Sequence, residues 1–218
     1  MLNRGGVLNV PNVSFVDEDS SVRYLLENIP THNGYEYVDL GLPSGLKWAK
    51  CNVGASSPEQ SGLYFAWGEI FGYTVEQVTS GRKPFNEASY ATSNIYANLT
   101  LSQDAAHVNM GGNWRMPTKA EYQELLNNCN VVWTADYNGT GVAGKVFTSK
   151  VNGNSVFFSA AGIGSDSSVS WVGEKGNYWS SSWDSDFYAW KLDFNSGNIK
   201  VINDSLRSYG CSVRGVFK

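Results

Sequence analysis

Short runs of alternating apolar and polar residues, separated by turns rich in Gly, Asn and Ser, fill most of the chain from Gly34 onward. Such runs are typical of half-buried strands joined by tight turns. Around Asn152-Gly153-Asn154 they predict an antiparallel hairpin. Altogether the pattern predicts two hairpins and a closing strand. The first hairpin pairs residues 145–151 with 155–160, the second pairs 189–194 with 199–202, and the closing strand covers 212–217.

One amphipathic helix interrupts the strand pattern. Thr118 and Glu121 form a capping box directly after Pro117, and the apolar residues that follow share one helical face: Tyr122, Leu125, Leu126 and Cys129. A second, shorter helix is expected over residues 102–108. Because helices and strands do not alternate, the pattern predicts a β-rich α+β fold.

Residues 1–33 contain few aromatic residues and one helical spacing of apolar residues, from Val22 to Ile29, that Pro30 ends. So short a helix is not stable alone in water. Its apolar stripe therefore packs either on the main domain or on another copy of the chain. We expect residues 1–33 to be an attachment or oligomerisation segment, for example of a trimer, ahead of a ligand-binding domain at residues 34–218.

Charge and hydropathy exclude two classes of partner. The 218 residues include 16 basic and 20 acidic ones, a net charge of −4, without a basic stripe. Nucleic acid phosphates need such a stripe, so no nucleic acid partner is expected. No apolar run approaches the roughly 20 residues that cross a membrane, and the first ten residues lack the apolar core of a signal peptide. No membrane insertion is therefore expected.

The reactive side chains form no recognisable catalytic or metal site. Cys51, Cys129 and Cys211 are too few and too far apart for a disulfide framework or a zinc site, so we expect free thiols, two of them buried. The glycines of residues 139–144 match a dinucleotide fingerprint, but a strand is expected after them where a helix is needed, which favours a hairpin loop. With His32 and His107 as the only histidines, we expect no catalytic residue, metal site or cofactor.

Large aromatic residues beside short polar runs set the last quarter of the chain apart, as in Tyr178-Trp179-Ser180-Ser181-Ser182-Trp183. A rigid aromatic framework that carries Ser, Asn, Asp and Tyr is typical of recognition surfaces, because aromatic rings provide contact area at low entropic cost. We expect Trp179, Trp190 and Phe194 in the core and the residues between them at the surface.

Four blocks of sequence carry a family resemblance. In chain order they are residues 39–49, Trp67-Gly68-Glu69, residues 111–118, and residues 178–182 continuing to Ser212-Val213-Arg214. With these blocks, residues 34–218 resemble the major-paralogous-domain family of bacterial surface and phage proteins. The resemblance implies a C-type-lectin-like fold, which formylglycine-generating enzymes share, with one or two helices and long irregular loops.

Relatives of that family include the variable proteins of diversity-generating retroelements, whose rewritten codons never encode Lys, Glu, Gln, Met or Trp. Twelve positions near the C-terminus contain none of these five types, which chance produces roughly 5–10% of the time at ordinary composition. By this resemblance the variable, ligand-binding positions are Asp184, Ser185, Asp186, Phe187, Tyr188, Asn203, Asp204, Ser205, Leu206, Ser208, Tyr209 and Cys211. The invariant scaffold between them is expected to be Trp183, Ala189, Trp190, Lys191, Arg207, Gly210, Val213 and Arg214.

The sequence departs from two related families. The Glu-Pro-Asn or Gln-Pro-Asp motif and the Trp-Asn-Asp motif, which hold calcium and sugar in true C-type lectins, are absent. Formylglycine-generating enzymes need two neighbouring cysteines as copper ligands, whereas Cys211 has no cysteine near it in the sequence. Neither calcium-dependent sugar binding nor that enzyme activity is expected.

These observations favour a non-enzymatic binding protein whose hypervariable face contacts a surface protein or glycan of a target cell. The missing signal peptide favours a phage tail, hence the virion, over the extracellular cell surface as its location. Two alternatives stay open. One is an invariant adhesin domain of a cell-surface or pilus protein, and the other is an enzyme of the formylglycine-generating type whose cysteines meet only in the fold.

Overall fold

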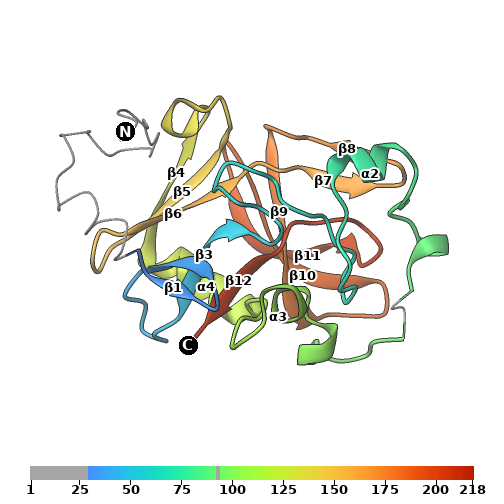
Figure 1. Ribbon diagram of the computed structural model, residues 1–218, viewed down its shortest axis with the longest axis horizontal. Coiled ribbons are helices and arrows are strands. Elements are labelled where there is room, and N and C mark those ends of the chain that lie inside the picture. The colour runs from blue at the N-terminus through green and yellow to red at the C-terminus, as the bar shows by residue number, and fades with distance from the viewer. Residues whose placement is uncertain (1–28, 92–93) are drawn as a thin grey trace, which may run out of the picture. The chain divides into compact units, whose positions relative to one another are not determined.

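Antiparallel strands form most of the regular secondary structure, as the hydrophobic pattern predicted. The computed structural model describes residues 29–91 and 94–218, and within them three α-helices and four antiparallel sheets (Figure 1). The β-rich α+β class is therefore confirmed. One compact unit comprises Thr31–Lys218. The helix predicted over residues 22–29 lies outside the described residues except for Ile29.

A four-stranded sheet joins the first and last strands of this unit. Its order is β1-β2-β3-β12, so the C-terminal strand pairs with a strand from the beginning of the unit. His32 of β1 stacks on Phe217 of β12 with 4.2 Å between the ring centroids, and the domain thus begins a few residues before Gly34. The strands are β1 (Thr31–His32), β2 (Tyr35–Asp39), β3 (Lys47–Asn52) and β12 (Arg214–Phe217).

Two three-stranded sheets, ordered β4-β5-β6 and β11-β10-β9, contain both predicted hairpins. The last strand of the second hairpin continues to Leu206, beyond the predicted end at Ile202. Residues 203–206 are therefore strand. The strands are β4 (Cys129–Thr134), β5 (Gly144–Ser149), β6 (Ser155–Ser159), β9 (Lys175–Trp183), β10 (Tyr188–Asn195) and β11 (Ile199–Leu206), and a further pair is β7 (Ile163–Ser165) with β8 (Ser168–Ser170).

The predicted capping box begins the longest helix, α4 (Lys119–Asn128). The Thr118 hydroxyl accepts a hydrogen bond from the Glu121 N–H at 3.2 Å, and the Glu121 carboxylate accepts one from the Thr118 N–H at 2.8 Å. The helix predicted over residues 102–108 is divided at Asp104, which ends the 3₁₀ turn η2 (Leu101–Gln103) and caps α3 (Ala105–Met110). The other short helices are α2 (Val75–Thr79), η1 (Glu87–Ser89) and η3 (Tyr137–Gly139).

Each of the four sequence blocks that carry the family resemblance places one tryptophan in the core. The Trp67 indole N–H donates to the Ser180 carbonyl and the Trp179 indole N–H to the Phe65 carbonyl, both at 2.8 Å. These bonds satisfy buried donors and tie segments together that lie more than a hundred residues apart. The four rings, each 0% exposed, are Trp48, Trp67, Trp114 and Trp179.

Trp179 and Phe194 are buried as predicted, but the prediction for Trp190 was wrong. The expectation that the residues between these rings lie at the surface was also wrong for six of them, because β9 is buried at consecutive positions and β10 is the central strand of its sheet: Ser180, Ser181, Ser182, Ala189, Lys191 and Leu192 are buried. The pairing register of β10 shifts between Ala189 and Lys191 against both neighbouring strands, which places Trp190 at a bulge. Its half-buried ring lies under the Lys119 ammonium, 4.1 Å from the ring centroid. A bulge redirects a side chain that strict alternation would have placed in the core.

The glycine motif of residues 139–144 lies in the connection between the antiparallel strands β4 and β5. Its last residue, Gly144, is the first residue of β5. The hairpin interpretation is confirmed, because a dinucleotide site needs a helix that begins behind the glycines.

Candidate functional site: the end of the β10–β11 hairpin

The two segments predicted as variable meet at one end of the β10–β11 hairpin. Tyr188 pairs with Leu206, and the next residue of β10 pairs with Ser205. The turn at residues 184–187, which precedes β10, is also bound to the end of β11, because the Arg207 N–H donates to the Phe187 carbonyl at 2.9 Å. Residues about twenty positions apart in sequence therefore form one continuous surface segment.

The buried side chain of Arg207 fixes the backbone of this turn. It is 1% exposed, and its Nη1 donates to the carbonyl oxygens of Asp186 at 3.0 Å and Ser185 at 3.4 Å. Its Nε donates to the Tyr90 hydroxyl at 3.0 Å, and the guanidinium lies 4.7 Å from the centre of a Trp67 ring. Because these bonds reach main-chain carbonyls, they do not depend on the side chains of residues 185–187. One side chain of the turn adds to them, since the Ser185 hydroxyl accepts a hydrogen bond from the Tyr188 N–H at 3.2 Å.

Nine of the twelve predicted residues reach the surface. Phe187 and Tyr188 are the largest of them, 64% and 39% exposed. Large apolar side chains with this exposure, beside short polar ones, are typical of contact surfaces. The exposed residues are Asp186, Phe187, Tyr188 and Asp204, and the half-buried ones are Asp184, Ser185, Asn203, Leu206 and Tyr209.

The other three predicted residues, Ser205, Ser208 and Cys211, are buried and have no side-chain surface to offer a ligand. The Ser208 hydroxyl donates to the Glu87 carboxylate at 2.8 Å. Cys211 exchanges backbone hydrogen bonds with Phe65, and burial raises its pKa to about 12. The structure therefore limits the candidate contact surface to the nine residues above.

The residues predicted as scaffold are largely buried beneath this surface. Lys191, 3% exposed, places its Nζ 3.3 Å from the Asp193 carboxylate and 3.4 Å from that of Asp204. A buried ammonium requires such partners, so Lys191 also positions the exposed Asp204. The buried scaffold residues are Ala189, Lys191, Arg207, Gly210, Val213 and Arg214, whereas Trp183 and Trp190 are half-buried.

A segment that the sequence did not indicate, residues 94–101, lies beside the same end of β9. The Asn98 side chain accepts a hydrogen bond from the Trp183 N–H at 2.9 Å, and the Leu99 N–H donates to the Ser181 carbonyl at 2.9 Å. Tyr96 is 65% exposed. Its only sequence signal is an aromatic residue in a polar stretch, which is too common to identify a site.

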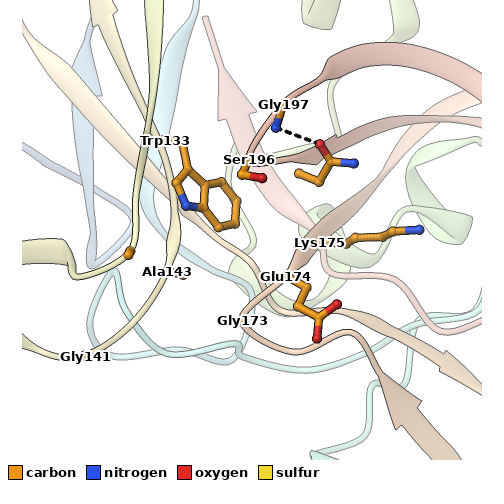
Figure 2. Close-up of a pocket in the computed structure, with 10 residues that line it drawn as sticks. Trp133, Gly141, Ala143, Gly173, Glu174, Lys175, Ser196 and Gly197 are labelled. Carbon is orange, nitrogen blue, oxygen red and sulfur yellow. Dashed lines mark hydrogen bonds between the residues drawn. The ribbon is translucent and has the colours of Figure 1, made fainter.

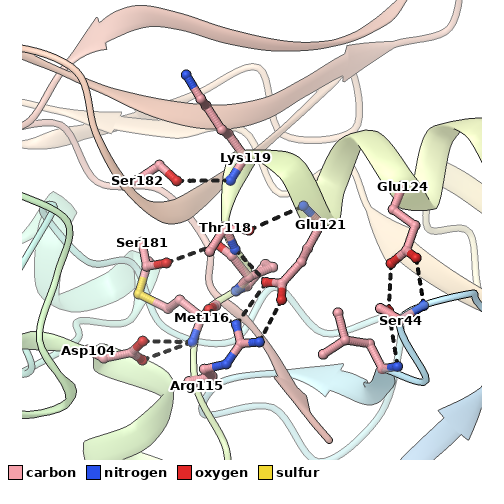
Figure 3. A network of polar contacts seen from close by, with 12 residues as sticks. Ser44, Asp104, Arg115, Met116, Thr118, Lys119, Glu121, Glu124, Ser181 and Ser182 are labelled. Atoms are coloured by element: carbon pink, nitrogen blue, oxygen red, sulfur yellow. Dashed lines mark hydrogen bonds and ion pairs between the residues drawn. The ribbon is translucent and has the colours of Figure 1, made fainter.

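A polar network fixes β9 from the side of α4 (Figure 3). The Lys119 N–H donates to the Ser182 hydroxyl at 3.0 Å, and Arg115 binds the Glu121 carboxylate with both terminal nitrogens, at 2.8 and 2.6 Å. The buried Asp104 carboxylate accepts from the Met116 N–H at 2.8 Å. This network gives the candidate surface a rigid base.

The surroundings of His107 and of the three cysteines are those of residues that pack the fold. His107 Nδ1 lies 3.0 Å from the Trp114 carbonyl, at hydrogen-bond distance. Cys51, Cys129 and Cys211 are free, and burial raises the pKa of each thiol. The described ranges contain no group of three or more His, Cys, Asp or Glu residues arranged to hold a metal ion.

Comparison with known proteins identifies no relative, since no protein-family model, curated protein or solved structure matches the chain. In the part of the chain that the structure describes, no helix is both long and apolar enough to cross a membrane. The function is therefore argued from the site alone.

Proposed function

We propose that this chain is a non-enzymatic binding protein with a C-type-lectin-like fold. Its contact surface, the variable face, consists of the nine surface residues at the end of the β10–β11 hairpin. The ligand is a surface protein or glycan of a target cell, and the protein acts on a phage tail or at the extracellular cell surface. From the resemblance to variable proteins of diversity-generating retroelements, we further propose that the codons for this face are rewritten, so that its residues differ between relatives.

One observation carries the proposal: the 184–187 turn, which ends with the exposed Phe187 and leads into the exposed Tyr188, is held through its backbone by Arg207. A binding face that tolerates sequence change needs a backbone whose shape does not depend on the changing side chains. Pre-ordered aromatic anchors also lose little conformational entropy when they bind. The bonds of Arg207 to main-chain carbonyls support the first point, and the ordered turn beside the Phe187 and Tyr188 rings supports the second.

Two observations support the proposed C-type-lectin-like fold: the four sequence blocks that resemble the family, and the burial of one tryptophan from each block in the core. Each block contributes a fully buried tryptophan, and two of these, Trp67 and Trp179, bond to main-chain carbonyls of distant segments. Residues that a family retains for its fold are expected at such positions.

The alternative of an invariant adhesin domain has one observation in its favour. Ser205, Ser208 and Cys211 are buried, and Ser208 is hydrogen-bonded to Glu87. Rewriting codons at such positions would often introduce side chains that the core cannot accept. If rewriting occurs, it is therefore confined to the exposed and half-buried positions.

Two experiments test the proposal. Deep sequencing of the gene from its source population is expected to show substitutions concentrated at residues 184–188, 203, 204, 206 and 209, at adenines of a matching template repeat. Sparse and uniform variation would leave the invariant adhesin domain.

The second experiment measures binding of the labelled protein to intact cells from the same population. The double substitution Phe187→Ala and Tyr188→Ala is expected to abolish binding without a change in melting temperature, because these side chains are exposed. Phe71→Ala is the matched control, since the Phe71 ring is 74% exposed and does not belong to the variable face. If the double variant unfolds or still binds, the variable face is wrongly assigned.

A further inference from the structure

A hollow lies at the opposite end of the β10–β11 hairpin from the variable face. Its volume is about 750 Å³, within the usual range of small-molecule sites. The hairpin turn at residues 195–197 forms one side, and residues 173–175 and the β4–β5 connection form the others. β10 extends from Tyr188 to Asn195, so at 3.3 Å per residue about 23 Å separates the two places.

The Trp133 indole forms one wall of this hollow (Figure 2). The ring is half-buried and packs edge-on near Phe194, with 6.5 Å between centroids. Gly141 and Gly173 line the rim with φ angles of +74° and +80°, and a Cβ at either position would meet open space. Because neither glycine has a side chain to cover the hollow, the Trp133 ring is accessible to a ligand.

Three polar side chains in this hollow have unused hydrogen-bonding capacity. Within the described chain, no hydrogen bond or ion pair involves the Glu174 carboxylate or the Ser196 hydroxyl. Asn195 uses its Oδ1 to accept from the N–H groups of Gly197 and Asn198, both at 2.9 Å, which leaves its amide donors available. The hollow thus offers an acceptor, a donor and a hydroxyl beside an aromatic ring.

The charges in the hollow disfavour an ionic ligand. Lys175 places its ammonium 4.2 Å from the centre of a Trp171 ring, and in Figure 2 its side chain extends away from Trp133. Among the described residues, the Glu174 carboxylate therefore lines the hollow without a cation beside it and repels an anionic ligand, whereas a single accessible carboxylate binds a cation only weakly. No arginine lines the hollow to bind phosphate.

We propose that this hollow binds a neutral saccharide. The C–H groups on one face of a sugar ring pack against the electron-rich face of an indole, and the hydroxyl groups at its edge both donate and accept hydrogen bonds. Trp133 provides the packing surface, Glu174 accepts from sugar hydroxyls and Asn195 donates to them. The site is independent of the variable face, because it shares no residue with it.

The test is a microarray of neutral mono- and disaccharides, incubated with the labelled full-length protein. The saccharide retained best is then titrated into ¹⁵N-labelled protein to follow the Trp133 indole N–H signal. We expect retention of at least one saccharide class and a shift of that signal. Glu174→Gln is expected to weaken binding roughly 10–100-fold, the effect of losing a charge-assisted hydrogen bond.

Trp133→Ala is expected to abolish saccharide binding, with Val132→Ala as its matched control on the opposite face of β4. Should Trp133→Ala fail to fold, Glu174→Gln decides the question, because its exposed side chain supports no other group. The proposal is overturned if no saccharide is retained or if Glu174→Gln binds like the wild type. Loss of binding only in the Phe187→Ala and Tyr188→Ala variant would also overturn it and would assign the saccharide to the variable face.

Discussion

At the scale of single residues, this protein uses buried cations to shape its surface. Arg207 bonds to the backbone of the 184–187 turn, and Lys191 holds the exposed Asp204. Both side chains are at most 3% exposed. A buried guanidinium or ammonium keeps its charge only with several oxygen partners, so these residues fix the oxygens that surround them.

The substitution Arg207→Lys tests whether the buried guanidinium fixes the backbone of the 184–187 turn. The variant keeps the charge but loses the planar set of donors, so the carbonyls of Ser185 and Asp186 lose a fixed partner. We expect faster amide hydrogen exchange at residues 186–188 and weaker binding to target cells. Unchanged exchange in this segment would show that the turn is ordered without the guanidinium.

The two tryptophans at residues 179 and 190 provide a second prediction at this scale. Trp179→Ala removes a fully buried ring and is expected to lower the free energy of unfolding by about 3–5 kcal/mol. Trp190→Ala removes a half-buried ring at a bulge, under the Lys119 ammonium, and is expected to cost about 1–2 kcal/mol. Urea unfolding of both variants measures the difference, and equal losses would place Trp190 in the core.

At the scale of elements, the first turn of helix α4 bonds both to its own N-terminal cap and to strand β9, which lies beneath the candidate site. Glu121 closes the capping box with Thr118 and also binds Arg115. In the same first turn, the Lys119 N–H donates to the Ser182 hydroxyl of β9. Burial raises the pKa of the Glu121 carboxyl, but the hydrogen bonds from Arg115 and Thr118 and the Arg115 charge outweigh it. The net effect is a lowered pKa.

A lowered carboxyl pKa predicts the sign of a pH effect. The ionised Glu121 adds stability above its unfolded-state pKa of about 4.3, and this contribution is lost as the pH falls through the lower folded-state pKa. The stability difference between wild type and Glu121→Gln is therefore expected to be largest at neutral pH and to shrink in acid. Urea unfolding from neutral pH to about pH 3 measures it, with the exposed Glu174→Gln as control. A difference that does not change with pH would contradict the prediction.

At the scale of the whole molecule, Arg214 joins segments from both ends of the described domain. It is 0% exposed at the start of β12 and donates to the Asn52 side chain and to the carbonyls of Ala49, Lys50 and Phe157. These acceptors belong to β3 and β6, so one side chain connects two sheets. Burial lowers the pKa of its guanidinium, and these oxygens compensate for the lost water.

Arg214→Ala is expected to lower the free energy of unfolding by about 3–5 kcal/mol, because it leaves several buried acceptors without a donor. Arg214→Lys is expected to recover part of this loss, since an ammonium reaches fewer of the acceptors. Chemical denaturation of both variants checks the order. A loss below about 1 kcal/mol in the alanine variant would mean that water replaces the guanidinium.

The sequence by itself determined the elements that depend on neighbouring residues. The Thr118 and Glu121 pair predicted where α4 begins, and the turns at residues 152–154 and 195–198 predicted both hairpins. Capping, turn conformation and side-chain periodicity act over a few residues, so a linear pattern contains them. The family resemblance, together with the residue types near the C-terminus, predicted residues 184–188 and 203–211 as one candidate region.

Only the tertiary structure decided which of those residues reach the surface. Cys211 and Ser208 are buried by partners far away in sequence, Phe65 and Glu87, and residues 94–101 join the same end of β9 although nothing local indicates it. The bulge at Trp190 and the hollow at Trp133 likewise depend on how separate strands pack. Burial depends on contacts between distant segments, which residue type and spacing along one strand do not specify.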